Sequence, residues 1–156
     1  MADTYDLITL AEAKAGLNIT AATATFDTEL ALTITAVSQR IVELCGPVVT
    51  VTRTAEVYDG GYCDLWLRNV PWSPTVTIVV TSVAEYDTSG TARTLTAEDF
   101  DTKPADAYMV VPREASILRR SAGGPYRCEP GVQNVVVTYT VGRAATTALV
   151  PAKFKQ

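Results

Sequence analysis

The chain has 156 residues, of which 47 % are hydrophobic and 19 % charged, and its formal net charge at pH 7 is −4. This length and composition are typical of one globular domain, or of two small modules, with a sizeable core, and the negative charge argues against general binding to nucleic acid phosphates. Histidine is absent, which excludes Ser-His-Asp and Cys-His catalysis and histidine-ligated metal sites.

Three cysteines, Cys45, Cys63 and Cys128, lie far apart, and no Cys-x-x-Cys pair occurs. The pattern predicts reduced thiols that act as small apolar residues, rather than a zinc ribbon or a redox motif. The N-terminus lacks the basic flank and apolar segment of a signal peptide, and no apolar run approaches the roughly 20 residues of a membrane helix. We therefore expect a chain with neither a secretion signal nor a membrane anchor.

Residues 1–47 carry the signals of a helical module. Thr9-Leu-Ala-Glu12 is a capping box, in which the Thr9 hydroxyl and the Glu12 carboxylate each accept a hydrogen bond from a free backbone N–H. The short helix that follows is expected to end at Gly16, because glycine is favoured at helix C-termini.

A second, longer helix is expected over 27–45. Asp27 and Glu29 complement the helix dipole in its first turn, and Gly46-Pro47 stops it. Its apolar residues recur at alternating spacings of four and three, which places them in one stripe. A stripe this narrow must be covered by the β module or by a neighbouring subunit. The stripe consists of Leu30, Ile34, Val37, Ile41 and Leu44.

From residue 48 to residue 142 the apolar residues recur with a period of two instead of 3.6, which indicates β-strands. Apolar and threonine residues alternate at 76–81 and again at 135–141, and Asp59-Gly-Gly61 and Asp87-Thr-Ser-Gly90 are typical of tight turns. Tyr108-Met-Val-Val111 and Ser116-Ile-Leu-Arg119 are expected to pair. Six or seven short strands predict a small antiparallel barrel or sandwich.

The closing segment, 143–156, contains Leu149-Val-Pro-Ala-Lys-Phe-Lys155. Proline is favoured at the first position of a helix, so Pro151 predicts a C-terminal helix start. The predicted fold is therefore α+β: an N-terminal helix pair over 1–47, a β-rich module over 48–142, and the start of a helix in 143–156.

Three short segments hold chemistry-bearing residues, but none has the pattern of a catalytic or metal site. Asp59-Gly-Gly-Tyr-Cys-Asp64 lacks the alternating oxygen ligands of a calcium loop, and Glu98-Asp-Phe-Asp101 indicates a polar turn. Gly123-Gly124 lacks the Lys-Ser/Thr of a phosphate-binding loop. We expect no enzyme activity, no cofactor and no metal. The nearby arginines, Arg119, Arg120 and Arg127, indicate a solvated face.

The segments follow one another in a distinctive order. They begin with 7–17 and the helix of 29–45 that ends in Gly-Pro, continue through Tyr58-Asp-Gly-Gly61 and Leu65-Trp-Leu67, and close at 135–142 and 150–156. A hairpin at 86–91 and the segment 94–100 lie between Leu65-Trp-Leu67 and residues 135–142. In this order they resemble the head–tail connector (adaptor) family of long-tailed bacteriophages.

The resemblance implies a structural virion protein of the phage neck that assembles in the cytoplasm of the bacterial host. Members of the family form a ring, commonly of twelve subunits, beneath the portal protein, and they bridge it to the head-completion (stopper) or tail-terminator protein. In the family the Val-Pro start leads into long C-terminal helices that reach toward the portal, whereas this sequence stops at Gln156.

A closed ring needs two different complementary faces on each subunit. The apolar stripe of 27–45 is one candidate face, and the net negative charge suits a channel through which DNA passes without specific binding. The residues predicted to contact the portal are Val150, Pro151, Lys153 and Phe154. Those predicted to contact a neighbouring subunit lie in two loops: Tyr58, Asp59 and Tyr62, and Gly123, Gly124 and Tyr126.

Two alternatives remain. A β-rich tail or baseplate module could bind a host-surface glycan or another tail protein. Tyr62, Trp66 and Trp72 would form an aromatic platform for the glycan, although the helix pair argues against this alternative. A small metabolic enzyme would require a pocket with converging polar groups, and the sequence indicates none.

Overall fold

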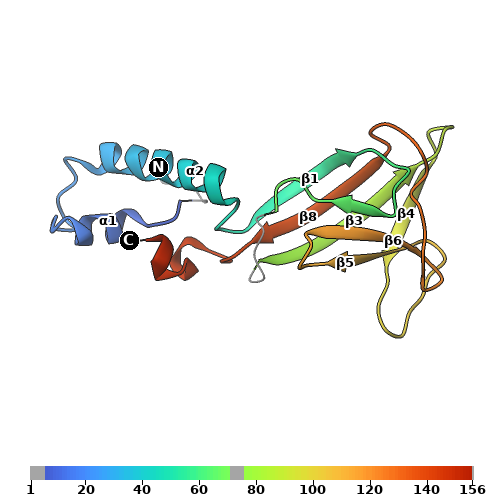
Figure 1. Ribbon diagram of the computed structural model, residues 1–156. Coiled ribbons are helices and arrows are strands. Elements are labelled where there is room, and N and C mark those ends of the chain that lie inside the picture. The colour runs from blue at the N-terminus through green and yellow to red at the C-terminus, as the bar shows by residue number, and fades with distance from the viewer. Residues whose placement is uncertain (1–5, 71–75, 156) are drawn as a thin grey trace. The chain divides into compact units, whose positions relative to one another are not determined.

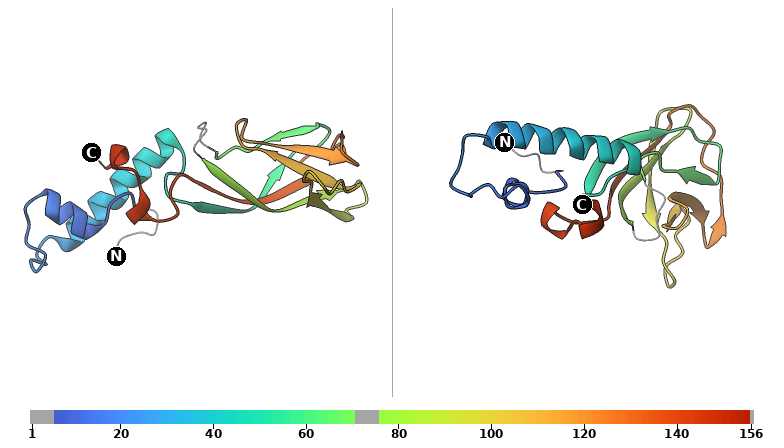
Figure 2. Two further views of the ribbon diagram at one scale, coloured as in Figure 1. Left: turned by 90° about the horizontal axis from the view of Figure 1, so that it is seen from below. Right: turned by 60° about the vertical axis from the view of Figure 1, so that its left-hand side comes forward.

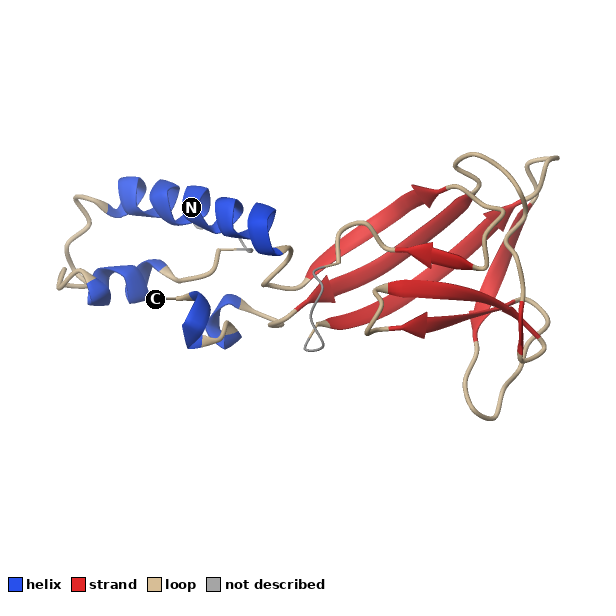
Figure 3. Ribbon diagram, viewed as in Figure 1, coloured by secondary structure: helices blue, strands red, loops and turns tan. Residues whose placement is uncertain are grey.

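The computed structural model describes residues 6–70 and 76–155 (Figure 1). The chain forms two compact units: a helical unit, Met1–Val51 with Gly142–Gln156, and a strand unit, Thr52–Val141. Figure 3 shows the helices in the first unit and the sheet in the second. Residues 143–156 thus belong to the same unit as the N-terminal helices.

Both predicted helices are confirmed. α1 (Leu10–Gly16) begins at the predicted capping box: the Glu12 N–H donates to Thr9 Oγ1 over 3.2 Å, and the Thr9 N–H donates to Glu12 Oε2 over 2.7 Å. α2 (Asp27–Cys45) ends at Gly46, which has a φ of 73°. That backbone region favours glycine, so the stop signal acts as the sequence predicts.

Polar contacts hold the helical unit together around a small core. The buried Ser38 on α2 accepts a hydrogen bond from the Leu7 N–H over 3.0 Å, and the Thr147 hydroxyl donates to the Asp6 carbonyl over 2.6 Å. Figure 2 shows α1, α2 and the C-terminal segment side by side. The core residues of this unit are Leu7, Val48, Val49, Ala144 and Val150.

The expected C-terminal helix start is wrong as an α-helix. The segment instead forms two 3₁₀ turns, η1 (Thr147–Leu149) and η2 (Ala152–Phe154). Their bonds span three residues, as in the Phe154 N–H to the Pro151 carbonyl at 2.9 Å. A 3₁₀ turn closes with fewer residues than an α-helical turn, so Pro151 initiates only this tighter form here.

The strand unit is built on one open, mixed sheet of eight strands in the order β1-β8-β3-β4-β5-β6-β2, with β7 paired to β6. The strands are β1 (Val51–Tyr58), β2 (Asp64–Trp66), β3 (Thr77–Tyr86), β4 (Ala92–Ala97), β5 (Ala107–Val111), β6 (Ser116–Ser121), β7 (Gly124–Pro125) and β8 (Val135–Gly142).

The predicted antiparallel barrel or sandwich is therefore wrong. β4 pairs antiparallel with β3 through Leu95, and its next residues, Thr96 and Ala97, pair in parallel with β5. β1 and β2 stand at opposite ends of the strand order, so the sheet is not closed. Alternating residues in a sequence report which face of a strand is buried, but not which strand lies beside it.

The alternation itself is confirmed where it is strictest. In β8 the side chains of Val135, Val137, Tyr139 and Val141 are 0 % exposed, and the intervening residues are partly exposed. The predicted pairing of 108–111 with 116–119 is also confirmed as the antiparallel ladder of β5 and β6. The core of this unit gathers Tyr58, Leu65, Leu67, Val76, Val83, Leu95, Tyr108, Ile117 and Cys128 around β8.

We predict that Gly60→Ala destabilises the strand unit by about 2 kcal/mol or more, because overpacking forces the backbone to shift. A Cβ at Gly60 would lie 1.9 Å from the Glu129 carbonyl oxygen. The matched control is Gly124→Ala, whose Cβ would meet its nearest atom at 3.5 Å. Urea unfolding followed by circular dichroism checks both variants, and equal stability of the two would contradict this account of the turn.

Candidate interaction surfaces

An apolar groove of about 470 Å³ lies between α1, α2 and the end of the C-terminal segment, all within the helical unit. Its volume falls within the roughly 300–1,000 Å³ of ligand pockets. The side chains that line it are mostly apolar: Leu7, Ile8, Glu12, Ala13, Gly16, Leu17, Leu30, Thr33, Ile34, Val37, Ser38, Ile41, Phe154 and Lys155.

The apolar stripe predicted on α2 is only partly covered in this structure. Ile34 is 6 % exposed and belongs to the buried face, but Val37 is 53 % exposed and Leu44 is 70 % exposed. The buried face is centred on Ala31, Ile34 and Ser38, and the stripe residues from Leu30 to Ile41 line the groove. Burial of apolar side chains is favourable, so the open part of this stripe is a candidate contact surface.

One end of the groove carries an ion pair, and an arginine lies over its aromatic residue. Lys155 Nζ lies 2.6 Å from Glu12 Oε1, and the Arg143 guanidinium lies over the Phe154 ring, 5.3 Å from its centroid. The hydrogen bond from Lys155, with the backbone bond from Thr9, lowers the pKa of Glu12 to about 2. Opposite charge and donated hydrogen bonds favour the ionised carboxylate.

The four residues predicted to contact the portal have different surroundings. Val150 is 5 % exposed and packs in the core of the helical unit, whereas Pro151 is exposed. Phe154 is partly buried and lines the groove. Lys153 lies in η2, and its side chain is outside the described part of the structure. The predicted portal contact therefore depends chiefly on Pro151 and Phe154.

A second pocket, of about 350 Å³, lies at the start of the edge strand β2. Two of its aromatic residues are exposed, Tyr62 at 64 % and Trp66 at 56 %. Trp66 Nε1 donates to Asp64 Oδ2 over 2.9 Å, which fixes the indole beside a carboxylate. Trp72, the third residue of the predicted glycan platform, lies outside the described residues. The complete lining is Tyr58, Asp59, Tyr62, Asp64, Leu65 and Trp66.

The structure brings the two loops predicted to contact a neighbouring subunit together. The Gly61 N–H donates to the Cys128 carbonyl over 3.1 Å, and the Cys128 N–H donates to the Tyr62 carbonyl over 2.9 Å. These bonds align 60–62 with the segment that follows Tyr126. Tyr126 is 47 % exposed, and Asp59 is exposed while its Oδ1 accepts from the Gln133 N–H over 2.8 Å.

The other three residues predicted to contact a neighbouring subunit are less accessible. Tyr58 is 4 % exposed, and the Arg68 guanidinium lies 4.9 Å from its ring centroid. Burial raises the pKa of Tyr58 to about 12. Gly123 and Gly124, at the β6–β7 turn, are partly exposed. Of this set, Asp59, Tyr62 and Tyr126 present the most surface.

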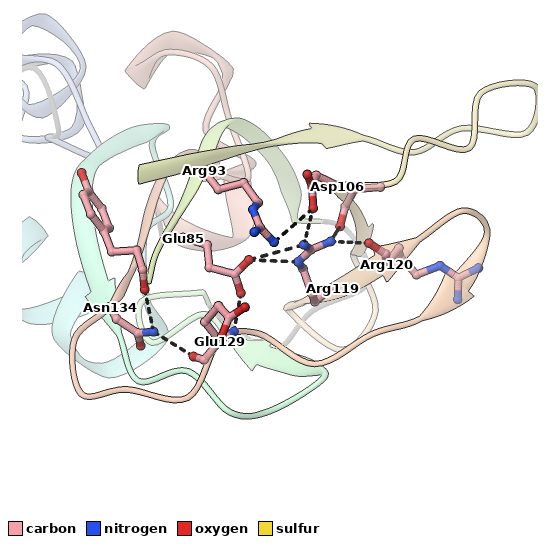
Figure 4. Close-up of polar contacts among 9 residues, drawn as sticks. Glu85, Arg93, Asp106, Arg119, Arg120, Glu129 and Asn134 are labelled. Atoms are coloured by element: carbon pink, nitrogen blue, oxygen red, sulfur yellow. Dashed lines mark hydrogen bonds and ion pairs between the residues drawn. The ribbon is translucent and has the colours of Figure 1, made fainter. Parts of the chain in front are cut away.

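A buried ionic network joins four segments of the strand unit (Figure 4). Arg119 and Glu85 are each 1 % exposed, and Arg119 Nη2 lies 3.4 Å from Glu85 Oε2. Arg119 Nη2 also lies 2.8 Å from Asp106 Oδ1, and Nη1 donates to the carbonyl oxygens of Ala107 and Arg120. A buried guanidinium needs this number of acceptors, because an unpaired charge in the interior is strongly unfavourable.

The same network fastens the loop between β7 and β8. Glu85 Oε1 accepts from the Glu129 N–H over 2.5 Å, and the Tyr126 ring lies under the Arg119 guanidinium at 5.0 Å. Asn134 Nδ2 donates to the carbonyls of Glu129 and Tyr86. The solvated face expected for Arg119 is therefore wrong. Strand alternation in the sequence indicates this burial, because side chains two residues apart lie on the same face of a strand. Arg119 follows the buried Ile117 by two residues, and Glu85 follows the buried Val83 by two residues.

The loop between β4 and β5 presents one exposed aromatic ring. Phe100 is 91 % exposed, the highest value among the large apolar side chains of the described residues. Asp99 Oδ1 accepts from the N–H groups of Asp101 and Thr102 at 2.9 and 2.6 Å, which confirms the predicted polar turn. The exposed ring at its tip was not predicted as a functional residue, because the surrounding carboxylates dominate the pattern.

The base of this loop is fixed by ion pairs. The Glu98 side chain is 2 % exposed and lies 3.3 Å from both Lys103 Nζ and Arg120 Nη2. The hydrogen bond from Arg120 lowers the pKa of Glu98. Arg120 Nη2 also donates to the Gly123 carbonyl, so the β6–β7 turn and the Phe100 loop share one anchor.

The three thiols remain free in the structure. Cys128 is buried, and desolvation, with the nearby Glu85 charge, raises its pKa to about 12. A protonated, buried thiol is a poor nucleophile. Cys128 therefore acts as a packing residue, and Cys45 is the exposed thiol.

Neither α-helix in residues 6–70 and 76–155 has the length and apolar character to cross a membrane. Within the same residues, no group of three or more Cys, Asp or Glu side chains is arranged to hold a metal ion. Comparisons of the chain with protein-family models, with curated proteins and with solved structures find no match.

We predict that Glu85→Ala lowers the free energy of unfolding of the strand unit by roughly 3–5 kcal/mol, because it leaves the Arg119 charge buried with one carboxylate fewer. The control is Arg93→Ala, which removes a 3.5 Å ion pair to Asp106 whose two side chains are 46 % and 44 % exposed. Its expected cost is below about 1 kcal/mol. Denaturant unfolding measures both, and a cost for Glu85→Ala as small as that of the control would disprove the role of the network.

We predict a pH-dependent contribution from Glu12. Its pKa in the folded chain is about 2, against an ordinary value of 4.5, so the ionised carboxylate stabilises the folded state above pH 4.5 and this contribution is lost as the pH falls toward 2. Because the side chain is 44 % exposed, water screens the pair and the effect is about 0.5–1 kcal/mol. Wild type should exceed Glu12→Gln in stability at pH 7, and the difference should shrink below pH 4.5 and disappear as the pH falls through about 2; a constant difference would refute the assignment.

Proposed function

We propose that this chain is a structural subunit of a bacteriophage head–tail connector, which forms a ring in the neck of the virion. The proposal starts from the order of the sequence segments, from the capped helix pair through the Asp-Gly-Gly turn to the closing Val-Pro. By resemblance, about twelve copies would form the ring beneath the portal protein. The ring would bridge the portal to the head-completion (stopper) or tail-terminator protein.

The observation that carries the proposal is the amount of apolar surface that a single copy leaves open. Val37 and Leu44 on α2 and Phe100 on its loop are each more than half exposed. Exposed apolar patches mark sites of protein association, and Val37 lies in the apolar groove of the helical unit. A ring subunit requires such faces, because each copy is completed by its neighbours.

The charge balance supports the channel part of the proposal. The formal net charge is −4, and like charge between a lumen and DNA phosphates prevents adhesion. DNA would pass without specific binding. A lumen that proves strongly basic in the assembled ring would contradict this point.

The portal contact is proposed at the C-terminal segment. Pro151 is exposed there and Phe154 is partly exposed. Phe154 lies under the Arg143 guanidinium, and its partly exposed side chain would add apolar area to a contact with the portal protein.

One observation favours a second candidate, a β-rich tail or baseplate module that binds a host-surface glycan. Tyr62 and Trp66 line one pocket together with Asp59 and Asp64. Aromatic faces with nearby carboxylates suit the C–H and hydroxyl groups of a sugar. Binding of saccharides by monomers or trimers would favour this candidate over the connector.

The test is size-exclusion chromatography with negative-stain microscopy of the purified chain, alone and with portal protein. We predict ring-shaped particles whose abundance rises with protein concentration and with added portal. A monomer at every concentration, with or without portal, would contradict the proposed function.

A further inference from the structure

The Phe100 loop has the properties of an interaction anchor. Its ring is 91 % exposed, and the backbone beneath it is fixed by the Asp99 hydrogen bonds and by the Glu98 ion pairs. A preorganised loop loses little conformational freedom on binding, and buried aromatic anchors carry a large share of interface energy. The exposed Phe100 ring would therefore fit a concave apolar surface on a partner.

The chain itself carries such a surface. The groove of the helical unit has a volume of about 470 Å³ and is lined mostly by apolar side chains. Leu17 and Val37 on its walls are 59 % and 53 % exposed. Both would lose most of this exposure beneath an inserted aromatic ring.

The charges around the two surfaces are complementary. Asp99 and Asp101 flank Phe100, and within the described part of the chain the Asp101 carboxylate forms no ion pair. At the groove, Lys155 pairs with Glu12 and follows Phe154 in the chain, and Arg143 lies over the Phe154 ring, so two basic groups lie beside one carboxylate. Opposite charges at the edge of an interface fix the register in which two surfaces meet.

We propose that Phe100 of one copy inserts into the apolar groove of a neighbouring copy, with Asp101 facing Lys155. This inference rests on the proposed function, because it names the two surfaces that join the subunits. The contact is heterologous: the donating and the receiving surfaces differ, so every copy can give one anchor and receive another. Heterologous contacts generate rings when the rotation between copies closes.

The first experiment compares four variants of the full chain by sedimentation velocity over a range of concentrations. Phe100→Ala removes the anchor, and Val132→Ala is its control, an exposed apolar residue of the strand unit at 82 %. Val37→Glu places a charge in the groove, and Leu32→Glu is its control on the same helix, 68 % exposed and outside the groove lining. Thermal unfolding by circular dichroism establishes that each variant folds.

We expect the assembly midpoint to rise on the order of tenfold or more for Phe100→Ala and for Val37→Glu, and to stay unchanged for both controls. If the wild type assembles and these two variants assemble equally well, the anchor is wrong and the proposed function stands. If the wild type never assembles, the proposed function itself fails.

A second experiment locates the contact directly. A photo-crosslinking amino acid replaces Phe100 in ¹⁵N-labelled protein, which is mixed with unlabelled wild type, and the crosslinked peptides are identified by mass spectrometry. We expect mixed-isotope crosslinks to the groove segments 7–17, 30–41 and 154–155. Crosslinks within one chain, to other segments, or only to added portal protein would each overturn the proposal.

Discussion

The buried Arg119 charge is the constraint on which the strand unit depends. Its guanidinium reaches Glu85 on β3, Asp106 before β5, and backbone carbonyls, and Glu85 in turn holds the Glu129 amide. A guanidinium in the interior requires all of these acceptors at once, so strands distant in sequence must come together for the charge to be tolerated. Arg120, the next residue, pairs with Glu98. The two consecutive arginines thus anchor both ends of the β4–β5 connection, at Glu98 and at Asp106.

This arrangement connects the stability of the sheet to the proposed assembly. The backbone of the Phe100 loop is held at its base by the Glu98 ion pairs and closed by the Asp99 hydrogen bonds, and it presents an exposed ring. The helical unit supplies the opposite feature, a groove that its own side chains do not fill. Each unit leaves large apolar side chains exposed in a single copy. A second copy, with the same two features, can cover both surfaces.

The sequence predicted the local elements well, because caps, stop signals and strict alternation are local. The capping box at Thr9, the stop at Gly46 and the buried face of β8 all follow from neighbouring residues. The sheet topology could not be predicted in this way, since β4 changes its partner from β3 to β5 within two residues. The groove also lay beyond the sequence pattern: the stripe on α2 was evident, but which part of it stays open depends on how α1 and the C-terminal segment pack. The burial of Arg119 was also not predicted, because a charged side chain is tolerated on the inward face of a strand only where distant residues supply its partners.

The central claim is that the apolar surfaces left open by one copy are covered by identical copies. A cryo-electron microscopy reconstruction of the assembled particle at side-chain resolution tests it most directly. The account predicts a closed ring in which the Phe100 ring of every subunit lies between α1 and α2 of the next. A ring in which this groove faces solvent, or is filled by a different protein, would contradict it.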